Sequence, residues 1–296
     1  MTGFICLDKP QDITSFLAVN KLRRLLGEKK VGHTGTLDPM ATGVLLVALG
    51  GATRFIELIP NHDKSYFAEV KLGLMTDTLD VTGNVLKEEK TNLTKKQLEE
   101  VIKKFTGRIK QVPPMFSAIK KDGVRLYDLA RKGIEVEREE REVEIEKIEI
   151  VDFDESNQEF SIKVDCSEGT YIRTLAEDIG KELGTFATLK KLVRTKANGF
   201  ENPYSFDEIK NIVEQNRLNE IILPVDKVLE LYPKVNVSPA QSIRFSNGGE
   251  LSLERLRGNF EDGYYRIYSP DEKFLGIGQA DNDSGEMKVK RVYNER

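Results

Sequence analysis

The chain has 296 residues, a length that suggests one large domain and a smaller one. With 39% hydrophobic and 32% charged residues, its composition is ordinary for a globular protein. No apolar run approaches the roughly 18 residues of a membrane span, and residues 1–10 lack the pattern of a secretory signal. The net charge of −4 does not by itself indicate a nucleic-acid partner. Because Cys6 and Cys166 lie far apart in sequence, we expect buried reduced thiols and a cytoplasmic protein.

Charge is segregated along the sequence. Residues 101–133 contain nine Lys or Arg and two Asp or Glu, whereas residues 134–159 contain twelve acids and three bases. A basic segment of this kind indicates either a phosphate-binding surface or a solvated helix face. We treat residues 101–133 as a candidate clamp for a polyanion.

The first 60 residues alternate strand and helix patterns. Residues 3–8 predict a short strand, and Ser15 is placed to cap a helix over residues 16–26. Residues 31–43 are rich in glycine and contain Pro39, which predicts a shaped loop. The continuously apolar residues 44–49 predict a buried strand, and residues 53–59 a short helix.

The middle of the chain mixes both periodicities. Residues 65–74 alternate as a half-buried strand, and residues 142–152 and 160–164 predict paired antiparallel strands. Helical patterns cover residues 94–105 and 170–183, with a shorter helical turn at residues 125–131. Because strands and helices follow one another irregularly, we expect an α+β fold with a mixed, largely antiparallel sheet flanked by helices.

A change of texture near Tyr232 and Pro233 predicts a domain boundary. Beyond it, glycines separate short apolar alternations, which is typical of a small β-barrel-like module. We therefore expect domains at residues 1–231 and 232–296.

Residues 32–43, with the sequence GHTGTLDPMATG, are the most informative stretch. Glycines allow close backbone approach and Pro39 restricts the residue before it, so the loop can hold the Asp38 carboxylate as a nucleophile or general base. A structural turn, in which Asp38 caps the residues that follow, is the simpler alternative. The loop lacks the Gly-Lys-Ser/Thr ending of a phosphate-binding loop, and His33, His62 and the cysteines are not spaced as zinc ligands.

The loop resembles the signature of the TruB family of tRNA pseudouridine synthases. Further blocks agree in order and spacing: LDKP at residues 7–10 with Thr14-Ser15, DKSY at 63–66, QVPPMFSA at 111–118 and GTYIRTL at 169–175. The resemblance covers about residues 3–200, and residues 232–296 resemble the PUA RNA-binding domain of many members. It implies isomerisation of uridine 55 in the T arm of tRNA, by base flipping and without metal or cofactor.

The resemblance also implies roles for single residues. Asp38 matches the catalytic aspartate, Arg173 the arginine that pairs with it, and Tyr171 a second active-site tyrosine. On the substrate side, Tyr66 matches an aromatic that stacks on the flipped base, His33 a residue that fills the gap, and Leu192 a lining of the uracil pocket. Without the resemblance, Tyr66 equally fits a packing residue between strands. At Val193 the chain departs from the two arginines that often follow the leucine, which puts one RNA or structural contact in doubt.

For partners, the resemblance implies tRNA, no membrane, no required protein partner and a monomer. Two alternative functions are also consistent with parts of the sequence. A non-catalytic RNA-binding protein or tRNA folding chaperone would have no need of Asp38, Tyr66, Tyr171 and Arg173 together. A synthase that works in an RNA–protein complex on guide-selected sites is disfavoured by the short flanks and the bacterial-type signature.

Overall fold

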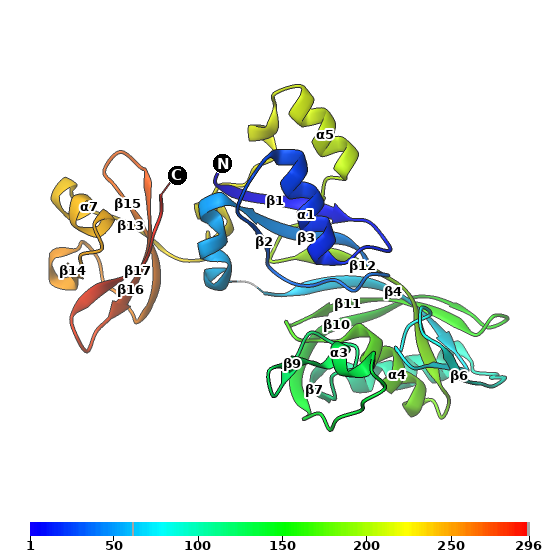
Figure 1. Ribbon diagram of the computed structural model, residues 1–296. Coiled ribbons are helices and arrows are strands. Elements are labelled where there is room, and N and C mark those ends of the chain that lie inside the picture. The colour runs from blue at the N-terminus through cyan, green and yellow to red at the C-terminus, as the bar shows by residue number, and fades with distance from the viewer. Residues whose placement is uncertain (61, 295–296) are drawn as a thin grey trace.

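The computed structural model describes residues 1–60 and 62–294 (Figure 1). Its helices are α1 (Ser15–Leu26), α2 (Lys95–Ile102), α3 (Leu126–Ala130), α4 (Ile172–Glu182), α5 (Phe206–Glu214), α6 (Val225–Val228) and α7 (Pro239–Ser246). Its 3-10 helices are η1 (Gly50–Leu58), η2 (Lys103–Phe105), η3 (Leu218–Glu220) and η4 (Leu253–Arg255).

The strands of the larger part are β1 (Gly3–Lys9), β2 (Val31–His33), β3 (Thr42–Leu49), β4 (Lys64–Leu72), β5 (Leu74–Thr76), β6 (Val85–Glu88), β7 (Gly107–Gln111), β8 (Lys120–Lys121), β9 (Val124–Arg125), β10 (Arg141–Asp154), β11 (Glu159–Cys166) and β12 (Ala187–Ala197). Eight of them form one sheet in the order β1-β3-β12-β4-β11-β10-β7, with β2 also paired to β3. Only the β12–β3 contact in this sheet is parallel among the described residues. The predicted α+β class with a mixed, largely antiparallel sheet is confirmed.

The sheet is buried on both faces at β1 and β3. Ile5 and Leu45 pack with α1 and α5 on one face, whereas Phe4 and Leu46 pack with η1 and α6 on the other. A strand covered on both sides needs apolar side chains at every position, which explains the unbroken run at residues 44–49. Figure 1 shows α1 and α5 over this part of the sheet and α3 and α4 beside β10 and β11.

Helix α1 begins one residue earlier than its sequence pattern predicts. The Thr14 hydroxyl, not that of Ser15, accepts the backbone N–H of Leu17 at 3.1 Å and caps the helix. Ser15 is instead buried, and its hydroxyl is used by the loop at residues 32–43. The predicted cap was wrong because two adjacent hydroxyls fit the pattern, and only the tertiary contact separates them.

Residues 232–296 were expected to be a module of short strands. The structure has a five-stranded sheet in the order β13-β15-β16-β17-β14, and the helix α7 packs with it, which the sequence pattern did not predict. The strands are β13 (Lys234–Asn236), β14 (Leu251–Ser252), β15 (Gly263–Tyr268), β16 (Phe274–Asp281) and β17 (Glu286–Val292).

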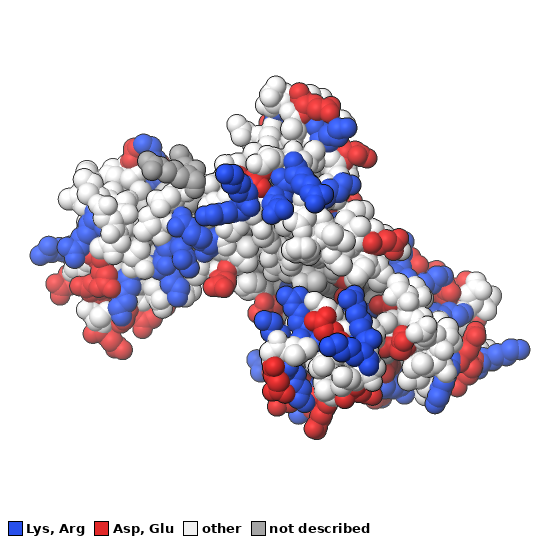
Figure 2. Space-filling model, viewed as in Figure 1, with Lys and Arg blue, Asp and Glu red and all other residues white. Residues whose placement is uncertain are grey.

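The segregation of charge along the sequence does not persist in space. Strand β7 pairs with β10, so Arg108 lies 3.6 Å from Glu142 and Lys110 lies 3.6 Å from Glu140. Lys104 is likewise 2.5 Å from Glu182. The clamp expected over residues 101–133 stays a prediction. Six exposed bases of this segment have no carboxylate partner in the described chain, and all of them except Lys103 lie at residues 120–132, around α3 (Figure 2).

Both cysteines are buried free thiols, as expected. Among the described residues, no helix has the length and apolar character needed to cross a bilayer.

Candidate active site

The loop at residues 32–43, called here the signature loop, is fastened to the body by buried polar groups. The Ser15 hydroxyl donates to the Leu37 carbonyl at 3.1 Å and accepts the Leu37 N–H at 2.8 Å. The ammonium group of Lys9, which is fully buried, donates to the carbonyls of Pro10, Ile13 and Pro39. Burial lowers the pKa of Lys9 to about 8. These contacts fix the residues on both sides of Asp38.

Arg194 supports the same loop from below. Its side chain is 1% exposed, and the guanidinium donates to the carbonyls of Val44 at 2.7 Å, Thr36 at 3.2 Å and Gly35 at 3.2 Å. Arg194 follows Val193, where the family often has a first arginine. The remaining arginine thus has a structural task inside the protein, and its buried guanidinium is already occupied by three carbonyls.

Asp38 and Arg173 form a two-pronged ion pair. The Nε of Arg173 lies 2.8 Å from Oδ2 of Asp38, and its Nη2 donates to Oδ1 at 3.0 Å. The guanidinium also donates to the carbonyls of Thr78 at 3.1 Å and Phe116 at 2.8 Å, so its orientation is fixed. The Arg173 side chain is 4% exposed, whereas Asp38 keeps 32% of its side-chain surface exposed. The carboxylate is therefore both held in place and open to a ligand.

Asp80 is a further acid in this cluster that sequence reasoning missed. Its Oδ2 lies 3.9 Å from Nη1 of Arg173, and its Oδ1 accepts hydrogen bonds from Thr78 and Thr82. The side chain is almost fully buried. The dense Thr and Asp residues at 76–82 were a signal for a polar turn, but nothing in the pattern shows that the turn folds back onto α4.

The electrostatics of Asp38 suit a reactive carboxylate. Burial raises the pKa of Asp38, the Arg173 charge opposes that rise, and the Asp80 charge adds to it. A carboxylate with a raised pKa is a better proton acceptor than an ordinary surface aspartate.

Tyr171 lies directly before α4, two residues from Arg173. Its backbone is held at both ends by the buried amide of Gln111, which accepts the Tyr171 N–H at 3.0 Å and donates to its carbonyl at 3.3 Å. Burial raises the pKa of the Tyr171 phenol, and the Asp38 charge is close enough to contribute. Gln111 was noticed only as part of a motif, and its clamping role is visible only in the fold.

Tyr66 and Leu192 line the sheet beneath the loop. Both are buried, on β4 and β12, and share one apolar cluster with Leu37, Met40 and Ala41 of the signature loop. Burial raises the pKa of Tyr66 to about 12. The structure supports the packing interpretation of Tyr66, because the residue is buried below the loop that carries Asp38, and its stacking role stays a prediction.

His33 stands apart from this group, on β2 at the start of the signature loop. It pairs with Val47 of β3, and burial lowers its pKa, with the Arg194 charge adding to the effect. Its buried Nδ1 has no hydrogen-bond partner within the described part of the chain. The structure thus brings Asp38, Arg173, Tyr171, Tyr66 and Leu192 around one loop, with His33 at its edge.

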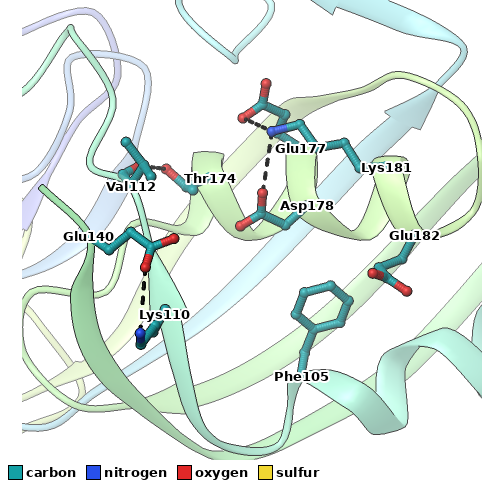
Figure 3. Close-up of a pocket in the computed structure, with 9 residues that line it drawn as sticks. All are labelled: Phe105, Lys110, Val112, Glu140, Thr174, Glu177, Asp178, Lys181 and Glu182. Atoms are coloured by element: carbon teal, nitrogen blue, oxygen red, sulfur yellow. Dashed lines mark hydrogen bonds and ion pairs between the residues drawn. The ribbon is translucent and has the colours of Figure 1, made fainter. Parts of the chain in front are cut away.

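A cavity of about 300 Å³ lies elsewhere, against the side of α4 that carries Thr174, Glu177 and Asp178 (Figure 3). Its charged groups are already paired, with Lys181 lying 3.0 Å from Glu177 and 3.4 Å from Asp178. None of the six candidate residues lines it. Residues 1–60 and 62–294 also contain no group of three or more His, Cys, Asp or Glu side chains placed to hold a metal ion.

Comparison with known proteins decides the family. Residues 23–172 match the N-terminal domain of the TruB family of pseudouridylate synthases, which includes Asp38, Tyr66 and Tyr171. The chain belongs to the TruB family. Two further matches complete the chain: residues 173–230 with a tRNA pseudouridylate synthase B C-terminal domain, and residues 233–293 with the C-terminal domain of pseudouridine synthase II TruB. This TruB-family chain is therefore a pseudouridine synthase, an enzyme of the isomerase class.

Relatives agree over the full length. The tRNA pseudouridine synthase B of Clostridium tetani is 46% identical, over 94% of this chain and 96% of that protein. The enzyme of the same name from Azoarcus sp. is 43% identical, over 98% and 94%. Among solved structures, the Cbf5-Nop10-Gar1 complex and an H/ACA RNP bound to a substrate RNA contain chains with TM-scores of 0.76 and 0.75, at 24% and 22% identity. These cover 99% of this chain and 84% and 86% of those chains, and they support the fold alone.

Proposed function

We propose that this TruB-family enzyme converts uridine 55 in the T arm of tRNA to pseudouridine, with Asp38 as the reactive group. The observation that carries the proposal is the open Asp38 carboxylate, gripped by a buried arginine at 2.8 and 3.0 Å. The tRNA substrate is supported by the full-length relatives named tRNA pseudouridine synthase B. The T-arm position rests on the resemblance of the signature loop.

The reaction needs no external group. The C1′–N1 bond of the uridine breaks, the uracil turns within the pocket, and C1′ bonds to C5. The C5 hydrogen leaves to solvent while N1 gains a proton, so the product is an isomer of the substrate. Asp38 starts the cleavage, either by attack on C6 of the base or by removal of a ribose proton.

The surrounding residues prepare this step. The target base lies inside a folded arm, so it must be turned out of the stack before Asp38 can reach it. Tyr66 stacks on the turned base, Leu192 lines its pocket and His33 occupies the gap in the RNA. Tyr171 orients the base or moves the C5 proton, and its fixed backbone favours such a role.

The rest of the chain serves recognition. Residues 1–231 form the catalytic domain, and residues 232–296 a PUA-like domain that binds RNA. The exposed bases at residues 120–132 contact phosphates, because recognition of a folded arm depends on shape and backbone. The enzyme works as a cytoplasmic monomer without a protein partner, metal or cofactor.

Two rivals are less well supported. A protein that only binds RNA has no need of a buried arginine that fixes an exposed carboxylate. Nor does it need two tyrosines close to the charge of that carboxylate. A guide-dependent synthase is less well supported, because relatives at 40–46% identity carry the name tRNA pseudouridine synthase B.

The test is tritium release from unmodified tRNA that carries C5-labelled uridine, with purified protein alone and chelator present. Release of one tritium per tRNA, lost when uridine 55 is replaced by cytidine, is the expected result. No release, release from another uridine, or release only after a guide RNA or metal is added would contradict the proposal.

A further inference from the structure

Helix α1 carries an unusual exposed side chain next to the signature loop. Phe16 is 70% exposed, the largest exposed fraction among the large hydrophobic residues that the structure describes, and it alone of the 14 phenylalanines is exposed. Its neighbour Ser15 holds Leu37, the residue before Asp38, by two hydrogen bonds. The exposed aromatic residue therefore lies one position along α1 from the serine that holds the signature loop.

The charged residues of α1 are also all basic. Residues 15–26 contain Lys21, Arg23 and Arg24 and no acid, although the whole chain has a net charge of −4. Helices α2, α4 and α5 each mix acids with bases. None of the three cations of α1 forms an ion pair within residues 1–60 and 62–294, whereas the single exposed base of α4, Lys181, and that of α5, Lys210, both do.

Helical geometry separates these groups into two sides. Lys21 lies over the ring of Phe206, 4.3 Å from its centroid, so this side of α1 faces α5. Phe16, Asn20 and Arg23 are four and seven positions apart and share the other side, with Arg24 adjacent. Arg23 lies about two helical turns, about 10 Å, beyond Phe16. The result is a stripe with an aromatic ring at the active-site end and guanidinium groups at the other.

Helix stability explains only part of the stripe. Arg23 and Arg24 are in the last turn, where cations interact favourably with the helix dipole. That interaction gives no reason for an exposed Phe16 in the first turn. Aromatic rings alternating with basic groups are instead the chemistry that binds RNA, where rings stack on unpaired bases and guanidiniums contact phosphates.

The wider surface fits an RNA strand that passes over this stripe. Figure 2 shows Lys and Arg side chains gathered near α1 and the C-terminal module, and again below them around α3, with a mostly uncharged surface between the two groups. We infer that the α1 stripe (Phe16, Asn20, Arg23 and Arg24) is a docking surface for the RNA substrate. Phe16 stacks on an unpaired base close to the uridine in the site, and Arg23 and Arg24 bind the phosphates that follow. This inference rests on the proposed function.

The test compares Phe16→Ala, Phe16→Trp and the double variant Arg23→Ala/Arg24→Ala with wild type. Val85→Ala, which is 60% exposed on β6, and Lys96→Ala, exposed on α2, are the matched controls. Binding of unmodified tRNA is measured across salt, and single-turnover pseudouridine formation is measured at saturating tRNA. Thermal unfolding checks that each variant is folded.

We expect Phe16→Ala to weaken tRNA binding by about 5- to 150-fold with an unchanged salt slope, and Phe16→Trp to restore affinity. The double arginine variant should reduce the slope of log affinity against log salt by about two. Rates at saturating tRNA and both controls should match wild type, since the stripe docks the RNA without taking part in the reaction.

The inference would be overturned if Phe16→Ala bound tRNA as tightly as Val85→Ala does, or if the double arginine variant kept the wild-type salt slope. The proposed function would still stand in that case, provided that the wild-type protein forms pseudouridine. Dissociation of an oligomer by Phe16→Ala, with tRNA affinity unchanged, would instead assign the stripe to a second copy of the chain. If wild-type protein forms no pseudouridine on any tRNA, the proposed function fails independently of these variants.

Discussion

At the scale of single residues, the contact between Arg173 and Asp38 depends on the shape of the guanidinium as well as on its charge. Nε and Nη2 each meet one carboxylate oxygen, and two of the three remaining N–H groups donate to the carbonyls of Thr78 and Phe116. An ammonium group is a point donor and cannot make this set of contacts from one place.

Arg173→Lys should therefore lower the single-turnover rate by about 100-fold or more, although the charge is kept. Rapid-quench measurement of pseudouridine at saturating tRNA tests this, with Arg217→Lys on the surface as the control. A rate within a few-fold of wild type for Arg173→Lys would show that the two-pronged geometry is unnecessary.

The raised pKa of Asp38 leads to a pH prediction. If the reaction needs the ionised carboxylate, the rate falls as pH drops through the pKa of Asp38, and this acid limb lies above the ordinary aspartate value of 3.8. Asp80→Asn removes a negative charge that raises the pKa of Asp38. It also leaves Asp38 as the one carboxylate of this pair that interacts with Arg173. Both effects act in the same direction, so the acid limb should move to lower pH.

The control for this profile is Asp77→Asn, an exposed aspartate in the same turn that bonds Asn84 and does not contact Arg173. Its profile should follow wild type. An acid limb that stays in place in Asp80→Asn, or moves to higher pH, would contradict the electrostatic account.

Some residues of the site could be predicted from the sequence, and others could not. Asp38 and Arg173 lie in recognisable motifs, and the structure pairs them. Asp80 and Gln111 were missed as parts of the site because their function depends on which backbone and which charge they meet after folding. A buried acid and an exposed turn acid, such as Asp80 and Asp77, look alike in the sequence.

At the scale of elements, the close approach of β3 and β12 depends on Gly43. Its φ of +100° is unfavourable for other residues, and a Cβ there would lie 2.2 Å from the carbonyl oxygen of Arg194. This is the parallel contact of the sheet, directly beside the end of the signature loop. The glycine thus joins the loop to the strand that carries Leu192 and Arg194.

Gly43→Ala should destabilise the protein far more than Gly184→Ala, which has a φ of +77° but open space around its Cβ. Backbone strain alone costs about 1–2 kcal/mol, and Gly184→Ala should lose that amount. Gly43→Ala should lose several times more, because the two strands must separate. Urea unfolding measures both, and equal losses would show that the close approach contributes nothing.

Strand β12 is one of several elements that the sequence pattern did not predict, together with β7, α5 and α7. Its pairing with β4 shifts register after Leu189 and again after Arg194, which breaks the alternation of period two. It also buries a full arginine, which a hydrophobic pattern counts as exposed. By contrast, β3 is a continuous apolar run, and β4 and α4 keep a regular strand and helix period. These three elements were predicted within a few residues.

At the scale of the whole molecule, the C-terminal module is docked on the larger part. Phe55 of η1 is fully buried and lies 6.2 Å, between ring centroids, from both Phe274 and Tyr293. Arg266 also donates to the Asp226 carbonyl at 3.2 Å, and Tyr268 to the Asp226 carboxylate at 2.9 Å. A chain ending near Leu231 therefore exposes Phe55 as well as losing an RNA-binding surface.

We expect residues 1–231 to fold and to retain pseudouridine formation at saturating tRNA, with weaker tRNA binding and a lower melting temperature than the full chain. Full-length Phe274→Ala separates the two effects, because it should lower the melting temperature while tRNA affinity stays near wild type. Failure of residues 1–231 to fold, or loss of all product at saturating tRNA, would contradict the proposed division.

The most direct test of the account is Asp38→Asn, which keeps the shape and removes the charge that Arg173 holds. Pseudouridine yield by mass spectrometry and tRNA affinity across salt are measured on one preparation. We predict no pseudouridine, with tRNA affinity within a few-fold of wild type and a similar salt slope, because phosphate contacts supply most of the binding. Substantial pseudouridine from the asparagine variant would contradict the claim that Asp38 performs the reaction.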